Sequence, residues 1–268
     1  MTMLKIVGIL NVTPDSFSDG GKFYKINDAL KHAEKLITAG ADIIDVGGES
    51  SRPGSVAVSE DEEIKRVVPV IKEIKKKFPK IPVSVDTYKP EVALKAIDEG
   101  AEIVNDIYGL RWRDGSMADV VAEKKVTVII MHMKGTPQDM QKNPQYKNVI
   151  SEIYKFFKER LKFAKSKGIK KEKIILDPGI GFGKTLRHNL LIMKNLLKFG
   201  KLGIPIMVGP SRKSFINGLL NVDVSNRQEG TIASSIYSLL NGAKYLRVHD
   251  VLSVKRALTV FEAIKTAG

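Results

Sequence analysis

The chain has 268 residues, contains no cysteine, and carries a formal net charge of +14 from 44 lysine and arginine residues against 30 aspartate and glutamate residues. The absence of cysteine excludes a disulfide framework, a thiolate nucleophile and any cysteine-ligated zinc or iron–sulfur site. The positive charge could serve a nucleic acid, steer an anionic substrate or simply be solvated surface. We expect the last of these, with no nucleic-acid partner, because most of the basic residues fall in predicted helices.

The length suits one large α/β domain, and we expect a single domain over residues 1–268. No apolar run approaches the roughly 20 residues that a membrane-spanning helix needs. The first predicted strand begins close to the N-terminus, which leaves no room for a signal peptide. We therefore expect a cytoplasmic protein without membrane contact.

Short apolar segments recur along the chain, and each leads into residues that could take part in chemistry. In chain order they are 5–10 before Asn11, 43–44 before Asp45, 83–85 before Asp86, 103–104 before Asn105, 128–131 before His132, 174–176 before Asp177, 205–208 before Gly209 and Ser211, and 245–246 before Arg247 and His249. The intervening segments have helical periodicity. Eight such repeats predict an α/β fold, a single TIM (β/α)8 barrel, in which the strand carboxyl ends share the face that carries the active site.

A partial repeat supports the barrel. Three tripeptides have glycine in the middle and alanine at the end, and each stands just before a predicted strand: 39–41, 99–101 and 241–243. Glycine past the last helical turn accepts a left-handed conformation, so each tripeptide is expected to end a helix. Two long connections without periodicity, 13–25 and 47–58, are expected to be binding loops at the active face.

The segment from Asp177 to Thr185 ends in Gly-Lys-Thr and at first resembles a phosphate-binding loop. That motif needs glycine five positions before Gly183, where Pro178 stands. We interpret the segment instead as a tight glycine turn that lets a flat ligand approach the backbone while Asp177 projects from its strand end. A purely structural turn is the alternative.

Three strand ends supply carboxylate and amide groups to the expected pocket: Asp86, Asn105 and Asp177. They suit a heterocycle with an amidine-like edge, because a carboxylate can accept two parallel N–H bonds from such an edge. The alternative for Asp86 is capping of the helix that follows it. Asp106 should point to the other face of its strand and have a structural role.

Basic residues gather after the last two predicted strands, where this type of barrel often binds phosphate. Ser211 to Ser214 include Arg212 and Lys213, and Arg247 and His249 lie two apart on one strand face. Together they predict a cationic site for an anion. No histidine pair has metal-ligand spacing, but Mg²⁺ carried in with a diphosphate needs only one or two protein oxygens, and Asn11 could supply one.

Segments along the whole chain are recognisable as a family signature. Residues 8–21, 45–54 and 84–87 strongly resemble the signature segments of the dihydropteroate synthases. The resemblance continues in order through 105–107, 131–133, 177–184, 211–214 and 247–250.

This resemblance implies a barrel that condenses 6-hydroxymethyl-7,8-dihydropterin diphosphate with 4-aminobenzoate, with Mg²⁺ as cofactor and as a homodimer. It implies that the pterin is held by Asp86, Asn105, Asp177 and Lys213, the metal by Asn11 and the diphosphate by Arg247 and His249. It also implies that Phe17, Asp19, Ser51, Arg52 and Pro53 lie on two loops that fold over the site, and that Phe182 and Ser211 receive the aminobenzoate. The candidate catalytic residues are Asp86, Asp177, Lys213, Arg52 and Asp19.

Two other functions remain open at this point. A pterin-binding methyltransferase that moves a methyl group from methyltetrahydrofolate to a corrinoid protein shares the Asp and Asn pocket but has no use for a diphosphate site. A basic nucleic-acid-binding protein would explain the charge and predicts strong, salt-dependent binding to any polynucleotide.

Overall fold

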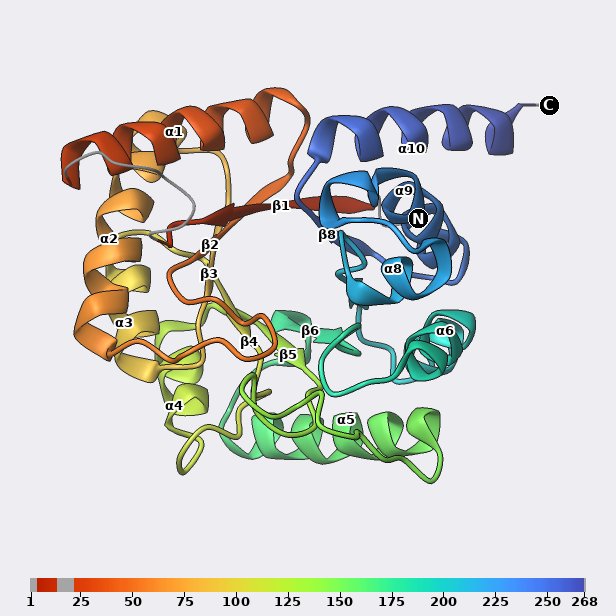
Figure 1. Ribbon diagram of the computed structural model, residues 1–268. Coiled ribbons are helices and arrows are strands. Elements are labelled where there is room, and N and C mark those ends of the chain that lie inside the picture. Colours follow the sequence, from red (N-terminus) through yellow and green to blue (C-terminus); the bar gives the residue numbers. More distant parts are fainter. Residues whose placement is uncertain (1–3, 14–21, 268) are drawn as a thin grey trace.

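The computed structural model describes residues 4–13 and 22–267 of the chain, and within them eight strands form one parallel sheet surrounded by helices (Figure 1). The strands are β1 (Lys5–Asn11), β2 (Ile43–Gly47), β3 (Val83–Asp86), β4 (Ile103–Asp106), β5 (Thr127–Met131), β6 (Ile174–Asp177), β7 (Met207–Val208) and β8 (Tyr245–Val248). Each predicted apolar segment contributes one strand. The alternation of strand and helix confirms the predicted α/β class.

The sheet closes into a barrel between β6 and β7. The hydrogen-bonded order is β6-β5-β4-β3-β2-β1-β8-β7, and Leu176 on β6 forms a parallel bridge with Ile206, just before β7. The Leu176 N–H donates to the carbonyl of Pro205 at 2.9 Å. The strand predicted over 205–208 is confined to Met207 and Val208, because Pro205 has no N–H to donate to a neighbouring strand. The bridge from Leu176 to Ile206 and the hydrogen bond from Leu176 to Pro205 close the barrel. The TIM (β/α)8 fold is therefore confirmed.

Helices cover the outside of the barrel. They are α1 (Lys22–Thr38), α2 (Glu60–Lys77), α3 (Pro90–Asp98), α4 (Ser116–Lys124), α5 (Val149–Ser166), η2 (Lys171–Lys173), α6 (Leu186–Lys194), α7 (Leu196–Gly200), α8 (Ser214–Leu220), η3 (Val224–Asn226), α9 (Gln228–Leu240) and α10 (Val251–Thr266). Their buried aliphatic side chains form the main core against the outer face of the sheet. Among the helices described here, none is long and apolar enough to cross a membrane.

Local sequence explains where these elements begin and end. Ser59 caps α2 by accepting the Glu62 N–H at 3.2 Å, and four acidic residues occupy the first turn, where the helix dipole favours negative charge. Gly40, Gly100 and Gly242 have φ values of 98°, 105° and 91°, which confirms the predicted left-handed helix ends. One boundary differs: α1 begins at Lys22, inside the loop predicted over 13–25.

The barrel interior is layered, and the layers place the functional residues. One apolar layer fills the barrel and is made of Val7, Ile43, Ile103, Ile129, Ile175 and Met207. Side chains two positions further along a strand point the same way, so the next layer toward the carboxyl ends is set by the same register. On β2, β4 and β6 that position is polar in each case. The apolar layer therefore forms the floor of a polar pocket.

Candidate active site

Five polar side chains from five strands meet above this floor: Asp45, Asp86, Asn105, Asp177 and Arg247. The Arg247 Nε lies 2.6 Å from Asp45 Oδ2, and Arg247 Nη2 lies 2.5 Å from Asp86 Oδ2. The Asn105 Nδ2 donates to Asp45 Oδ2 at 3.2 Å. Burial alone would lower the pKa of Arg247, but Asp45, Asp86 and, with a smaller effect, Asp177 raise it above its usual value. Four candidate residues from the sequence thus share one site with Asp45.

The pairing of Arg247 differs from the sequence-based prediction. The sequence suggested acidic groups on one side of the pocket and a cationic site on the other, whereas Arg247 lies between two carboxylates. The reason is strand order: β8 pairs with β1 and β1 with β2, so the long Arg247 side chain can reach Asp45 on β2 and Asp86 on β3. Asp86 therefore pairs with Arg247 and does not cap α3. The residue at the N-cap of that helix is Lys89, and no side chain caps the helix there.

Asp177 organises the turn that follows β6. Its Oδ1 accepts the Gly179 N–H at 2.6 Å. Gly179 has a φ of 68°, and a Cβ there would lie 2.1 Å from the His132 carbonyl oxygen, so only glycine fits. The turn is thereby packed against the end of β5, and the Asp177 carboxylate is held at the pocket.

Lys184, at the end of this turn, has a structural role in the present arrangement. Its buried Nζ donates to the carbonyls of Phe182 at 2.8 Å and His132 at 3.1 Å, and it also lies 3.1 Å from His132 Nδ1. These contacts hold the turn closed and agree with the rejection of a phosphate-binding loop. Asp106 is also structural, as predicted, because its carboxylate accepts the Tyr108 and Leu110 N–H groups at 2.8 and 2.7 Å.

Phe182 and Lys213 form one wall of the pocket. The Lys213 Nζ lies 4.2 Å from the centre of the Phe182 ring, a cation–π contact. Burial and then the Arg247 guanidinium lower the pKa of Lys213 to about 8, while Asp177 and Asp86 oppose the shift. Lys213, a candidate for binding the pterin, and Phe182, a candidate for receiving the aminobenzoate, are therefore direct neighbours.

Ser211 and His249 form a second pair at the rim. The Ser211 Oγ lies 3.0 Å from His249 Nδ1 and accepts the His249 backbone N–H at 3.2 Å. Burial, followed by the Arg247 guanidinium, lowers the pKa of His249 to about 3. His249 is therefore neutral at pH 7, so the expected contribution of this side chain to a cationic site is corrected: it offers hydrogen bonds and no charge.

The pocket holds carboxyl groups that titrate near neutrality. Burial raises the pKa of Asp86 to about 7, against the opposing Arg247 guanidinium. Burial raises the pKa of Asp177 to about 6, against the Gly179 N–H and Lys213. Because both carboxyl groups are buried beside cations, they can accept N–H groups from a ligand without large competition from water.

Further acceptors in the pocket lack partners. Within the described part of the chain, Asp45 Oδ1, Asn105 Oδ1 and Ser84 Oγ are buried and have no hydrogen-bond partner. Ser84 is opposite Asp45 in the β2–β3 register, and all three residues lie on neighbouring strands. Buried acceptors are normally satisfied, so this part of the pocket suits a ligand rich in N–H donors.

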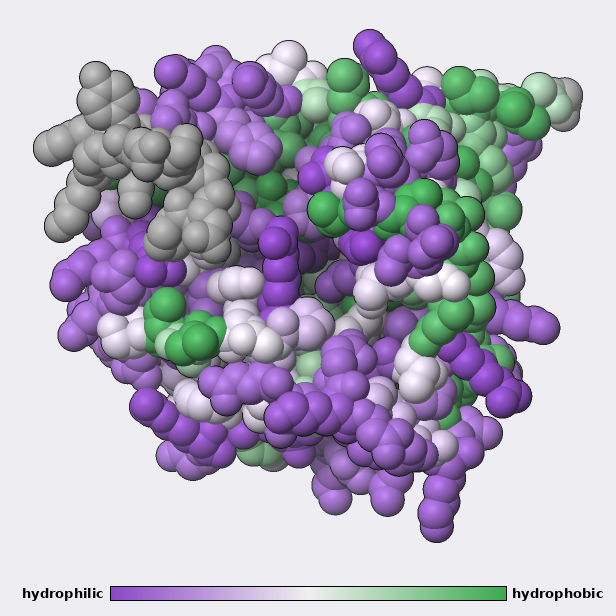
Figure 2. Space-filling view, in the orientation of Figure 1, coloured by the Kyte–Doolittle hydropathy of each residue, from purple (hydrophilic) through white to green (hydrophobic). Residues whose placement is uncertain are grey.

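The connection between β2 and α2 carries Ser51, Arg52 and Pro53 at the mouth of the pocket, where Figure 2 shows a hydrophilic hollow in the molecular surface. Its tip is attached to the β5–α5 connection, because the Gly54 N–H donates to the Pro137 carbonyl at 3.0 Å. Arg52 is exposed, and its charge is among the smaller causes, after burial and Arg247, of the lowered pKa values of Lys213 and His249.

The two remaining loop candidates, Phe17 and Asp19, lie outside the described residues. Asn11, the candidate metal ligand, ends β1 opposite Gly47. A Cβ on Gly47 would lie 3.7 Å from both Asn11 Oδ1 and Asp86 Oδ2, so these oxygens converge on one point of the rim. Across the described residues, no group of three His, Cys, Asp or Glu residues could hold a metal. Asn11 Oδ1 is an oxygen donor of the kind that Mg²⁺ accepts when most of its other ligands come from a phosphate group or water.

The chain matches the pterin binding enzymes over nearly all of its length. The sequence model of the pterin binding enzyme family matches residues 7–249, nearly the whole barrel. A dihydropteroate synthase from Clostridium beijerinckii is 51% identical over 97% of this chain and 93% of its own length.

Solved structures agree. A Xanthomonas albilineans dihydropteroate synthase with 4-aminobenzoic acid has a TM-score of 0.93 and 40% identity, covering 99% of this chain and 94% of that one. The same organism's enzyme in complex with 7,8-dihydropteroate has a TM-score of 0.89 and 37% identity, covering 99% and 95%. The chain belongs to the dihydropteroate synthase family and is an enzyme of the transferase class.

Proposed function

We propose that this chain condenses 6-hydroxymethyl-7,8-dihydropterin diphosphate with 4-aminobenzoate to give 7,8-dihydropteroate and pyrophosphate, a step in folate biosynthesis. The observation that carries the proposal is the convergence of Asp86, Asn105, Asp177, Lys213 and Arg247 on one pocket at the strand carboxyl ends. Related enzymes solved with 4-aminobenzoic acid and with 7,8-dihydropteroate support the choice of substrates.

The reaction needs stabilisation of charge more than a general base. The bond between the pterin methylene carbon and the diphosphate oxygen breaks with both electrons leaving on the diphosphate, so positive charge develops in the pterin ring. Carboxylates at Asp86 and Asp177 stabilise that charge. The neutral amine of 4-aminobenzoate then forms the new C–N bond and releases one proton to solvent.

Arg247 is proposed to change partners during binding. In the structure its guanidinium is held by Asp45 and Asp86. When a pterin occupies Asp86 with its own N–H groups, the Arg247 Nη2 becomes available to the diphosphate, while Asp45 keeps the Nε side in place. Lys213 adds a second cation, and Ser211 and neutral His249 add hydrogen bonds.

Magnesium is proposed to enter with the diphosphate. Asn11 would hold it through its amide oxygen, together with diphosphate oxygens. When bound, the ion supplies neutralisation of the negative charge on the departing pyrophosphate.

The direct test is to incubate the purified chain with both substrates and Mg²⁺ and to follow pyrophosphate release. We expect release that depends on 4-aminobenzoate, together with stoichiometric 7,8-dihydropteroate. A protein that releases no pyrophosphate, yet transfers a methyl group from methyltetrahydrofolate to a corrinoid protein, would instead support the methyltransferase alternative.

We also infer a homodimer, with α8, α9 and α10 as the contact surface. Large apolar side chains are exposed there, namely Leu219, Leu220, Tyr237, Leu240, Val260 and Ile264. Figure 2 shows hydrophobic surface, in green, along the right-hand side of the molecule. Residues 214–240 contain one arginine against one aspartate and one glutamate, and α10 adds Lys255, Arg256 and Lys265 against Glu262, so the surface carries a net charge of +1 in a chain of net charge +14. A second copy can therefore meet this surface without the repulsion that the remainder of the molecule would impose.

Sedimentation of the purified protein checks this inference. We expect twice the monomer mass for the unmodified chain, and monomer for Leu240→Glu. Val56→Glu is the control, because Val56 is 80% exposed on the β2–α2 connection and lies outside the contact surface. If the unmodified chain sediments as a monomer at micromolar concentration, the inferred homodimer is contradicted.

A further inference from the structure

The two ends of the β2–α2 connection are tied together by one buried lysine. Lys89 Nζ donates to Glu49 Oε2 at 2.6 Å, near the start of the connection, and to the Val58 carbonyl at 2.7 Å, near its end. Glu49 Oε2 also accepts the Val58 N–H at 3.0 Å. Residues 49 and 58 are therefore held at one point, and the segment between them, with Ser51 and Arg52, forms a closed loop.

The same lysine fixes this loop to α2. Its third donor contact is to Glu63 Oε2 at 2.6 Å, in the first turn of that helix. The Lys89 side chain is only 5% exposed and that of Glu63 only 1%, so three hydrogen bonds to two carboxylates and a carbonyl compensate the buried ammonium. Below the loop, a Cβ on Gly48 would lie 2.7 Å from Val67 Cγ1, so the chain passes directly against α2.

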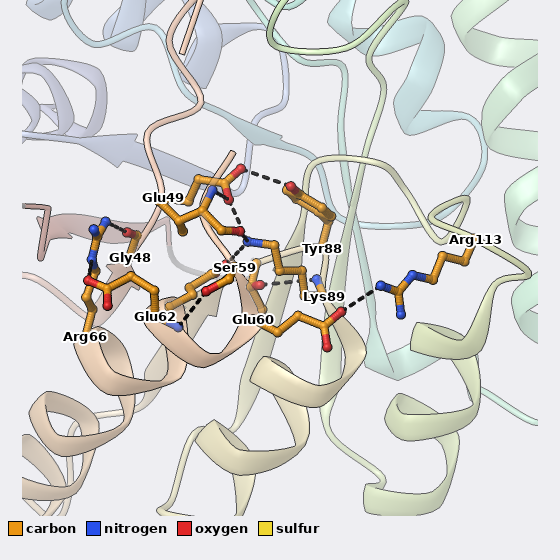
Figure 3. Close-up of polar contacts among 12 residues, drawn as sticks. Gly48, Glu49, Ser59, Glu60, Glu62, Arg66, Tyr88, Lys89 and Arg113 are labelled. Carbon is orange, nitrogen blue, oxygen red and sulfur yellow. Dashed lines mark hydrogen bonds and ion pairs between the residues drawn. The ribbon is translucent and has the colours of Figure 1, made fainter. Parts of the chain in front are cut away.

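Glu49 is held from the other side as well. Its Oε1 accepts the Tyr88 hydroxyl at 3.0 Å, and Figure 3 shows Tyr88 and Lys89 both directed toward Glu49. Tyr88 in turn packs against Tyr108 and Trp112, with ring centres 4.7 and 4.6 Å away. The carboxylate thus has a fixed position within a rigid aromatic cluster.

This arrangement joins two parts of the proposed site. Lys89 follows Asp86 by three residues in the short β3–α3 connection, so its backbone moves with the strand end that carries a pterin-binding candidate. Its side chain ends at the loop that carries Ser51 and Arg52. The buried pair of Lys89 and Glu49 therefore links the pterin pocket to the loop over its mouth. Glu63, the second carboxylate bound by Lys89, is among the smaller causes of the raised pKa of Asp86.

We propose that Lys89, together with Glu49, is a positioning pair that holds the Ser51–Arg52 loop over the pterin pocket and so supports use of the second substrate, 4-aminobenzoate. The proposal rests on the proposed function. It assigns a role in the reaction to buried charges that a stability argument alone does not explain, because a buried ion pair is weak evidence of stability.

The test compares Lys89 with Lys75, each of which makes three polar contacts. Lys89 binds the first turn of α2 from outside the helix, whereas Lys75 lies in the last turn of α2. Lys75 Nζ donates to the carbonyls of Pro79 and Ile81 at 3.1 Å each and to Glu102 Oε1 at 2.7 Å, far from the pocket. Lys89→Met and Lys75→Met should both lower the melting temperature. Only Lys89→Met should lower kcat/KM for 4-aminobenzoate, by about tenfold or more, with the pterin diphosphate Kd changed by less than about threefold.

A second variant keeps the test decisive if Lys89→Met does not fold. Glu49→Gln retains the side-chain shape and one hydrogen-bond acceptor but loses the charge that pairs with Lys89. We expect the same selective loss in kcat/KM for 4-aminobenzoate. Hydrogen exchange of the backbone amides should accelerate in the segment 50–58 and stay unchanged in β3 and β4.

Two results would overturn the proposal. One is faster exchange in 50–58 with unchanged kinetics for both substrates. The other is an equal loss of affinity for pterin diphosphate and of kcat/KM for 4-aminobenzoate in the Lys89 and Glu49 variants, which indicates a general structural role. Failure of the proposed function is distinct, because the unmodified chain would then release no pyrophosphate in the same assay.

Discussion

Arg247 is the residue that decides the electrostatic character of the pocket. Three carboxyl groups, Asp45, Asp86 and Asp177, surround two cations, Arg247 and Lys213. With all five ionised the set carries one net negative charge, which matches a ligand whose ring becomes positive during reaction. The cost of burying these charges appears as the raised pKa values of Asp86 and Asp177.

Asp177→Asn tests the carboxylate at the residue scale. The amide oxygen can still accept the Gly179 N–H, so the turn should persist, while one charge-assisted contact to the pterin is lost. We expect a loss of about 2 to 3 kcal/mol in kcat/KM for the pterin diphosphate. Steady-state kinetics measure it, and unchanged kinetics would refute the role.

The raised pKa values also predict how pterin binding depends on pH. The carboxyl groups of Asp86 and Asp177 have folded-state pKa values of about 7 and about 6, above their usual range, so each is charged only above its value. As the pH falls through this window both gain protons and lose acceptor capacity. Affinity for 6-hydroxymethylpterin, which lacks the diphosphate, should therefore weaken between pH 8 and pH 5.

Calorimetry across that range measures the effect. In Asp177→Asn the fall should be smaller, because one of the two titrating groups is gone. An affinity for 6-hydroxymethylpterin that does not change from pH 8 to pH 5 would show that neither carboxylate binds the pterin.

At the scale of elements, the β6–α6 turn is built on glycines that have no substitute. Gly179→Ala would place a methyl group 2.1 Å from a carbonyl oxygen at a left-handed φ. We expect it to lower the free energy of unfolding by about 3 kcal/mol or more. Gly168→Ala is the matched control: its φ of 83° is also left-handed, but no atom lies within 4 Å, so about 1 kcal/mol is expected.

Denaturant unfolding of both variants gives the comparison. Equal losses for Gly179→Ala and Gly168→Ala would mean that the close contact between the turn and His132 does not exist in solution.

The β2–α2 connection is expected to act on turnover. Arg52 is exposed and close enough to shift the pKa values of groups in the pocket, yet its loop is attached at both ends and at its tip. Arg52→Ala should lower kcat while the pterin diphosphate Kd changes by no more than about tenfold. Calorimetry that shows abolished pterin diphosphate binding would contradict this role.

Particular residues show what the sequence could and could not predict about these elements. The strand ends at Asp86, Asn105 and Asp177 were predictable, because polar residues directly after buried strands must face one end of a barrel. Asp45 lies within β2 and faces the same pocket, but it is not among the predicted site residues. Its signal was available in Ile43, which is two positions earlier and shares its face.

Other features depend on long-range contacts that periodicity does not encode. The contact of Arg247 with Asp45 joins residues 202 positions apart and follows from strand order. Lys89 stands before Pro90 and resembles an ordinary residue at a helix start, so nothing local indicates that its side chain is buried. The neutral state of His249 is likewise set by burial and neighbouring charges.

For the whole molecule, the barrel separates two tasks along its axis. The apolar layer of Val7, Ile43, Ile103, Ile129, Ile175 and Met207 fills the interior and supplies stability. The polar layer above it is free to carry unpaired acceptors and buried charges, because the packed layer and the outer helices maintain the fold. Closure through Leu176 and Ile206 then brings β6 beside β7, and because β8 pairs with β7, Asp177 on β6 and Arg247 on β8 lie around one pocket.

The central claim is that one molecule of pterin diphosphate engages both sides of this pocket. A crystal structure of the protein with the pterin diphosphate and Mg²⁺, without 4-aminobenzoate, tests it most directly. We predict that the pterin edge contacts the Asp177 carboxylate while the diphosphate contacts the Arg247 guanidinium, which has left Asp86. A ligand that contacts only one of these two residues, or that binds elsewhere while Arg247 stays on Asp86, would contradict the claim.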